Sequence, residues 1–167
     1  MTLASHAVVG AVLAKAVPGS NLLVQFIFGF ISHFLIDAIP HGHYPIKSSR
    51  PDDSDPFYVD MPISKKSFPD FWKIGLDMAI GGAVTYLFLG GSDLTSYLTL
   101  FAGAIGGITP DALQFVYWKT RFKPLGVLQK FHLEVMHTKK LLDENKLLTY
   151  LVEGTTIAIF ILIASIL

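Results

Sequence analysis

The chain of 167 residues contains no cysteine and few charged residues. Without cysteine, the sequence excludes disulfide frameworks, thiolate zinc sites and cysteine nucleophiles, so a metal ion would be bound by histidine, carboxylate or backbone oxygen atoms. Charged residues make up 16% of the chain, against roughly 25% in ordinary soluble domains. The 13 basic and 13 acidic residues cancel, so no basic excess exists to hold a phosphate backbone. We therefore expect no nucleic-acid partner.

Apolar residues are abundant instead. They account for 51% of the chain, and the mean hydropathy is +0.51. Four long stretches carry almost no charge, at residues 16–36, 74–92, 94–110 and 147–167. A helix needs roughly 20 mainly apolar residues to cross a bilayer core about 30 Å thick, and each stretch approaches that length. The composition excludes a disordered chain and predicts an integral membrane protein whose partner is the lipid bilayer.

Turn residues divide the apolar sequence into helices. The motif Pro18-Gly19-Ser20-Asn21 separates a short helix over about residues 3–17 from a longer one over about residues 21–39. The N-terminal stretch lacks the basic region of a secretory signal peptide, so we expect it to stay in the mature protein. We predict an all-α fold: a single membrane domain over residues 1–167, built as a polytopic helical bundle with about five membrane helices, the first of them short.

Basic residues concentrate in two loops, five of them at residues 41–73 and seven at residues 119–146, with none at residues 90–95. The positive-inside rule makes both loops cytoplasmic and the 90–95 turn external, in the cytoplasmic (inner) membrane. We expect an irregular loop over residues 41–70 and an amphipathic cytoplasmic helix within residues 119–146. The acidic cluster at residues 51–56 lacks EF-hand spacing, which favours a solvated loop over a calcium site.

Six ionisable side chains interrupt the apolar helices: His6, His33, Asp37, Asp77, Asp111 and Glu153. Such groups cost at least a few kcal/mol each in a bilayer and normally face the protein interior. Counting along the helices at about 1.5 Å per residue places them in one layer, roughly 5–10 Å inside the cytoplasmic boundary. A common depth on separate helices predicts that these side chains share a site.

The spacing of these residues suggests metal binding. His33 and Asp37 are four residues apart and share one helix face, which suits two ligands of one ion, or a ligand and the carboxylate that orients it. A hydrogen bond that joins two helices is the alternative. Pro110 is expected to break or kink its helix beside Asp111, so that Thr109 caps a second half-helix. A packing kink, with Gly103 and Gly107 in a close helix contact, is the other interpretation.

His132 and His137 follow on the amphipathic segment. Residues five apart are separated by about 140° on a regular helix, so the two cannot both bind one ion from it. Either the helix is distorted there, or the two imidazoles serve different atoms of a site with more than one metal, or both are surface histidines.

Four motifs resemble those of the membrane-bound, LexA-regulated family of predicted metal-dependent hydrolases: Thr2-x-x-x-His6, Gly29-x-x-Ser32-His33-x-x-x-Asp37, Pro110-Asp111 and His132-x4-His137-Thr138. The chain is more distantly similar to the all-helical zinc-dependent phospholipase C enzymes. The order of the motifs differs from the family's, and Ala112-Leu113-Gln114 replaces the second Asp and the His that follow the family's Pro-Asp. His41 or Asp77 would substitute for them.

We therefore expect a hydrolase of an ester or phosphoester, from a small-molecule or lipid substrate. It would use a divalent transition metal, Zn²⁺ first, with Mn²⁺ or Fe²⁺ as alternatives. The predicted ligands or their supporting residues are His6, His33, Asp37, Asp111, His132 and His137. Asp77 and Glu134 are the candidates for the general base. A proton- or metal-coupled transporter and a non-catalytic membrane scaffold are the alternative functions.

Overall fold

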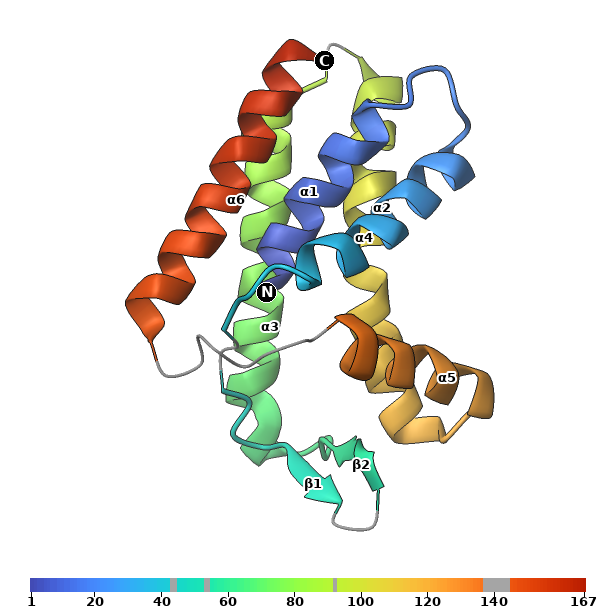
Figure 1. Cartoon of the computed structure of the whole chain (residues 1–167), viewed down its shortest axis with the longest axis vertical. Helices are drawn as coiled ribbons and strands as arrows, with labels where there is room; N and C mark the ends of the chain where they lie inside the picture. The colour runs from blue at the N-terminus through green and yellow to red at the C-terminus, as the bar shows by residue number, and fades with distance from the viewer. Residues whose placement is uncertain (43–44, 53–54, 92, 137–144) are drawn as a thin grey trace.

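The computed structural model describes residues 1–42, 45–52, 55–91, 93–136 and 145–167, which form a bundle of α-helices with one small β-hairpin (Figure 1). The elements in chain order are α1 (Leu3–Lys15), α2 (Leu22–Asp37), β1 (Arg50–Asp52), β2 (Asp55–Asp60), the 3₁₀ turn η1 (Lys65–Ser67), α3 (Phe68–Val84), the π-helical turn η2 (Thr85–Leu89), α4 (Leu94–Thr120), α5 (Lys123–Phe131), the π-helical turn η3 (His132–Met136) and α6 (Lys146–Ile166). The prediction of an all-α helical bundle is confirmed.

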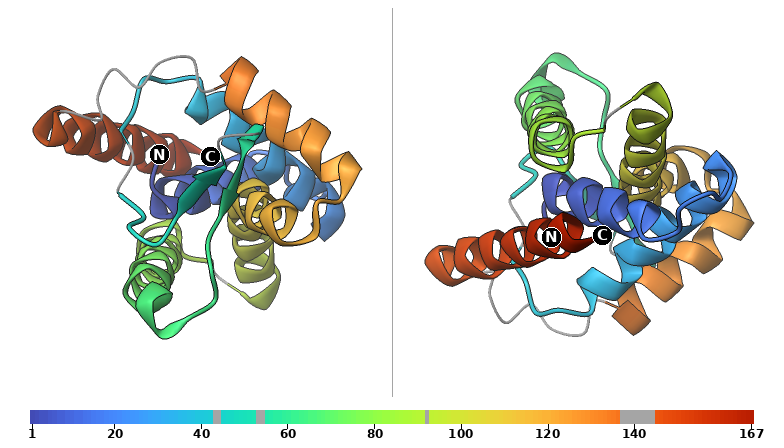
Figure 2. Two further views of the ribbon diagram at one scale, coloured as in Figure 1. Left: turned by 90° about the horizontal axis from the view of Figure 1, so that it is seen from below. Right: turned by 90° about the horizontal axis from the view of Figure 1, so that it is seen from above.

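Helix α1 is the centre of the bundle. It contacts α2, α3, α4 and α6, which are arranged around it (Figure 2). Most of its residues are buried, among them Val8, Val9 and Val12 with no exposed surface. The helix begins at about half the height of the molecule and ends near the end that carries the C-terminus (Figure 1). Its N-terminus therefore lies inside the molecule.

Glycines on α4 allow this helix to lie very close to α1. A Cβ atom at Gly103 would overlap the carbonyl group of Gly10, and one at Gly107 would overlap that of His6. The predicted close helix contact at Gly103 and Gly107 is confirmed, and it forms within the chain. This approach brings the backbone of α4 next to the polar side chains that α1 contributes.

Helix α4 runs through Pro110 without a break. The prediction that Pro110 ends one half-helix and that Thr109 caps a second one is therefore wrong. The Thr109 hydroxyl instead donates a hydrogen bond to the Ile105 carbonyl at 2.6 Å. A proline removes only one N–H group from the hydrogen-bond ladder, and the packing of α4 on both α1 and α2 keeps the helix continuous.

The loop over residues 41–70 is more ordered than predicted. Strands β1 and β2 pair in an antiparallel hairpin, with Arg50 opposite Asp60. Two contacts attach this loop to the helices. The Ser48 N–H donates to Asp70 Oδ2 at 2.8 Å, and Lys119 Nζ lies 2.7 Å from Asp60 Oδ1. In the amphipathic segment, α5 and η3 occupy residues 123–136, while residues 137–144 are outside the described ranges.

Helix α6 is long and apolar enough to cross a membrane, judged by length and composition, and among the described residues it is the one helix that passes this test. Helices α1 and α2 are apolar but shorter. Helix α3 continues directly into η2, so α-helical structure ends at Val84 although the chain stays helical to Leu89. The polytopic arrangement with about five membrane helices stays a prediction.

Candidate metal site

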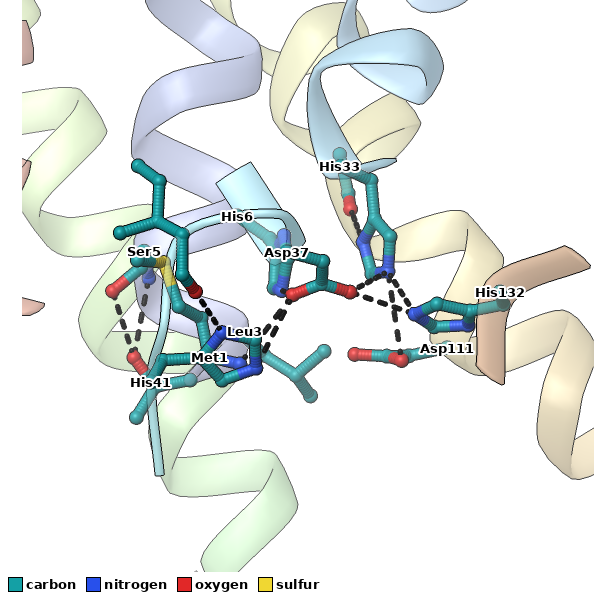
Figure 3. Close-up of polar contacts among 12 residues, drawn as sticks. Met1, Leu3, Ser5, His6, His33, Asp37, His41, Asp111 and His132 are labelled. Carbon is teal, nitrogen blue, oxygen red and sulfur yellow. Dashed lines mark hydrogen bonds and ion pairs between the residues drawn. The ribbon is translucent and has the colours of Figure 1, made fainter. Parts of the chain in front are cut away.

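Polar side chains from α1, α2, the loop after α2, α4 and the start of η3 meet beside the N-terminal end of α1 (Figure 3). We call this group the polar cluster; its members are His6, His33, Asp37, His41, Asp111 and His132. The Asp111 side chain is 31% exposed, whereas the other five residues are at most 3% exposed. Five of the six predicted ligands therefore come together, and the sixth, His137, lies outside the described residues.

Asp37, the last residue of α2, is the centre of the polar cluster (Figure 3). Its Oδ2 lies 2.7 Å from Nε2 of His132 and 3.1 Å from Nε2 of His33. Its Oδ1 lies 3.2 Å from Nε2 of His6 and 3.5 Å from Nε2 of His41. A carboxylate buried this deeply is stable only beside protonated imidazoles or a bound cation, and both of its oxygen atoms face imidazole nitrogens.

Backbone carbonyl groups orient two of the imidazoles. Nδ1 of His33 donates to the Gly107 carbonyl at 2.7 Å, and Nδ1 of His41 donates to the Ile39 carbonyl at 2.7 Å. A carbonyl oxygen accepts only a proton-bearing nitrogen, so the neutral ring has its lone pair on Nε2, the atom that faces Asp37. Metal-binding histidines have this arrangement, with the outer N–H bound to a carbonyl and the inner nitrogen directed at the ion.

Three donor atoms are close enough to bind one ion: Nε2 of His33, Nε2 of His132 and Oδ2 of Asp37. They lie 2.7–3.1 Å from one another. Ligand atoms about 2.0–2.1 Å from a tetrahedral zinc ion are about 3.3–3.4 Å apart, so a small outward shift of the side chains would accommodate the ion. Two imidazole nitrogens and a carboxylate oxygen also suit zinc, manganese and iron(II). The residues of the polar cluster thus fit a transition metal.

A second group of donor atoms overlaps the first and consists of His6, His33 and Asp111. The ring of His6 stacks on that of His33, with centroids 3.8 Å apart, and Asp111 Oδ1 lies 3.7 Å from Nε2 of His33. Since Nε2 of His33 has one lone pair, the two groups compete for it. Asp111 is the partly exposed member, so it connects the polar cluster with its surroundings.

His132 begins the π-helical turn η3, which follows α5 directly. Hydrogen bonds in a π-helix join residues five apart, and such turns are frequent at functional sites. Of the interpretations of the histidine pair, the structure favours a distorted helix at His132. The side chain reaches Asp37 and His33 from this turn.

Asp77 and Glu153 lie outside the polar cluster and bind the N-terminus of α1. Asp77 accepts hydrogen bonds from the N–H groups of Leu3 at 2.7 Å and Ala4 at 3.3 Å. Glu153 Oε1 accepts one from the N–H of Thr2 at 3.1 Å. The first N–H groups of a helix have no partner within it and carry partial positive charge. The two carboxylates therefore cap α1 from α3 and from α6, a role that the sequence analysis did not predict.

Glu134, the other candidate for the general base, lies on η3 with a side chain that is 50% exposed. Its Oε2 is 3.8 Å from Nζ of Lys130, one helical turn earlier. Asp77 is bound to the backbone of α1, and Glu134 pairs at the surface. The general-base role of either residue stays a prediction.

The chain has no match among protein-family models, among curated proteins or among solved structures. Its function is therefore inferred from the geometry of the polar cluster and from the distribution of polar and apolar side chains around it.

Proposed function

We propose that the chain is a membrane-embedded, metal-dependent hydrolase of an ester or phosphoester, with its ion held by the polar cluster near the cytoplasmic face. The observation that carries the proposal is the convergence of Nε2 of His33, Nε2 of His132 and Oδ2 of Asp37 in a buried site. Zinc is the first candidate, because it is commonly bound by three such protein ligands in catalytic sites. When bound, such an ion activates water as a nucleophile and polarises the scissile group.

The residues of the chain would support this chemistry in distinct ways. The Gly107 carbonyl holds His33 so that its Nε2 faces the centre of the cluster. Oδ2 of Asp37 lies beside Nε2 of His132 and Nε2 of His33, so the three atoms would hold the ion together. Burial of these groups excludes bulk water, which strengthens the electrostatic interactions inside the site. Asp111 lies at the exposed edge, where a substrate would first contact the cluster.

The distribution of side chains supports a membrane location. Glycines allow close helix contacts at α1, as at Gly103 and Gly107 of α4 and Gly81 of α3. Large apolar side chains also project from the outside of the bundle, as at Leu23 on α2, Leu87 on η2 and Leu162 on α6, each at least 65% exposed. Small residues at helix contacts are typical of membrane bundles, and extensive exposed apolar surface is rare on soluble monomers. The connections after α1 and η2 lie at the same end as the C-terminus, and the hairpin and α5 lie toward the other (Figure 1).

The two alternative functions differ in their support. A transporter was predicted from buried histidine and aspartate beside a broken helix, but α4 is continuous. A non-catalytic scaffold would use the polar cluster as a hydrogen-bond network that joins α1, α2 and α4. Metal analysis distinguishes this scaffold from the hydrolase.

Elemental analysis of the detergent-purified protein tests the proposal. We expect about one equivalent of transition metal in the wild type and its loss in His33→Ala, since one ligand would be missing. Ser32→Ala is the matched control, because Ser32 is a buried neighbour on α2 that bonds to the Gly29 carbonyl instead of the cluster. No bound metal in the wild type after reconstitution with zinc or manganese would contradict the proposal, as would full phosphoesterase activity in both His33→Ala and Asp111→Ala.

A further inference from the structure

A cavity of about 410 Å³ opens between α3 and α4, next to the polar cluster. Its walls are mostly apolar and include Ile74 and Met78 of α3 and Phe115 and Trp118 of α4. Small-molecule sites commonly have volumes of about 300–1,000 Å³ and predominantly apolar walls with a few polar groups. The cavity therefore has the size and lining of a ligand site.

Asp111 belongs both to this cavity and to the polar cluster. It lines the cavity, and its Oδ1 lies 3.7 Å from Nε2 of His33. The other members of the cluster are almost fully buried. A molecule in the cavity would therefore reach them by way of Asp111. A molecule in the cavity would thus contact Asp111 with one part and apolar side chains with the rest.

The cavity combines apolar walls with one carboxylate, that of Asp111, which lies beside the polar cluster. A pure hydrocarbon would match the walls alone. An amphiphile matches both, because its polar group can lie at Asp111 while its aliphatic part contacts the apolar side chains.

We infer that this cavity binds the aliphatic tail of an amphiphilic substrate whose ester or phosphoester group lies at Asp111. The inference rests on the proposed function and names its substrate class. Around the cavity, the outer surfaces of α3 and α4 carry exposed apolar side chains such as Trp72 and Val116, so an amphiphile would enter sideways from the bilayer. The tail would lie between Ile74 and Phe115.

Photolabelling with dodecyl phosphate that carries a diazirine near the end of its chain tests this inference. In zinc-loaded wild type in nanodiscs, we expect saturable labelling of α3 and α4 that excess unlabelled dodecyl phosphate displaces. Ala112→Trp and Ile74→Trp place a large ring at the cavity from opposite walls and should each reduce saturable labelling at least tenfold. Ala79→Trp is the matched control, because Ala79 is an exposed residue of α3 outside the cavity lining, and it should label like the wild type.

The same samples are analysed for metal, so that two failures can be told apart. Bound zinc without saturable labelling, or saturable labelling that persists in both Ala112→Trp and Ile74→Trp, overturns the tail site and leaves the hydrolase proposal intact. Saturable labelling without any bound metal overturns the hydrolase proposal and, with it, the identification of the amphiphile as a substrate. Bound zinc together with labelling that both tryptophan variants abolish supports the inference.

Discussion

At the scale of single residues, Asp77 has two candidate roles that a pair of variants separates. As a cap, it provides the acceptors for the first N–H groups of α1. Asp77→Ala removes both acceptors and should lower the free energy of unfolding by about 1–2 kcal/mol. Asp77→Asn keeps an acceptor oxygen and should have a smaller effect. Thermal unfolding of the detergent-solubilised protein measures both values, and we expect the metal content to stay at the wild-type level.

Glu134→Gln is the control for this comparison, since it removes a carboxylate from an exposed position. Exposed substitutions of this kind usually change stability by less than about 0.5 kcal/mol. If Asp77→Asn abolished turnover while leaving stability unchanged, Asp77 would be a general base, as its position in the polar layer first indicated, and the capping role would be of minor importance.

Counting depth along predicted helices found the residues of the candidate site because the helices were approximately right. His6, His33, Asp37 and Asp111 fall at one depth in the sequence, and all four meet in the polar cluster. Depth alone did not distinguish Asp77 and Glu153 from the members of the polar cluster. These two residues lie at the same depth, but their side chains bind the N-terminus of α1. The signal for their role was present, because a helix too short to reach both surfaces has buried N–H groups that need acceptors.

The role of the Gly107 carbonyl could not be predicted from the sequence. It depends on how closely α4 approaches α2, and a backbone group leaves no trace in the residue types. The distortion at His132 was one of several interpretations. The π-helical turn η3 favours it, and the contact of the His132 side chain with Asp37 excludes a surface position for this residue.

At the scale of elements, the contact of α1 with α4 depends on glycine. Gly103→Ala would place a methyl group on the carbonyl of Gly10. The backbones of α1 and α4 would have to move apart to make room for it, which would disturb the helices packed around them. We expect a loss of about 1–3 kcal/mol in the free energy of unfolding, as in overpacked cores. Gly154→Ala on α6 is the matched control, because a Cβ atom there meets nothing within 4 Å. It should be neutral or stabilise the helix by up to about 1 kcal/mol. Equal effects of the two substitutions in thermal unfolding would contradict this account.

The sequence predicted the helices better than the loop between α2 and α3. Long apolar runs and turn residues located α1, α2 and α6 to within a few residues. The hairpin was missed, because the proline and aspartate residues around Pro51 suggested irregular structure. The aromatic and β-branched run Phe57-Tyr58-Val59 was the available signal for a strand. At Pro110 the sequence predicted a helix end that the structure does not have. The local preference of proline to end a helix is weaker than the packing of α4 against its two neighbours, α1 and α2.

At the scale of the whole molecule, the directions of the helices determine which connections and which terminus lie at the same end of the bundle. The connections after α1 and η2 and the C-terminus lie at one end (Figure 1). The hairpin and α5, which carry basic residues in the described part of the chain, lie toward the opposite end. A bilayer crossing in the proposed sense would therefore expose the first end outside the cell and leave the basic segments in the cytoplasm.

Single-cysteine variants test this orientation against a background that has no native cysteine. Ala16 is exposed at the end of α1, and Ser64 is exposed between the hairpin and α3. In intact cells, a membrane-impermeant maleimide should label Ala16→Cys, and Ser64→Cys should react only after permeabilisation. The reverse pattern would invert the orientation and place the polar cluster near the external face. Labelling of both variants in intact cells would contradict a membrane-spanning bundle, because a protein that crosses the bilayer keeps its two ends in separate compartments. Release of the protein from membranes by alkaline carbonate would contradict it as well, because such a protein is not extracted without detergent.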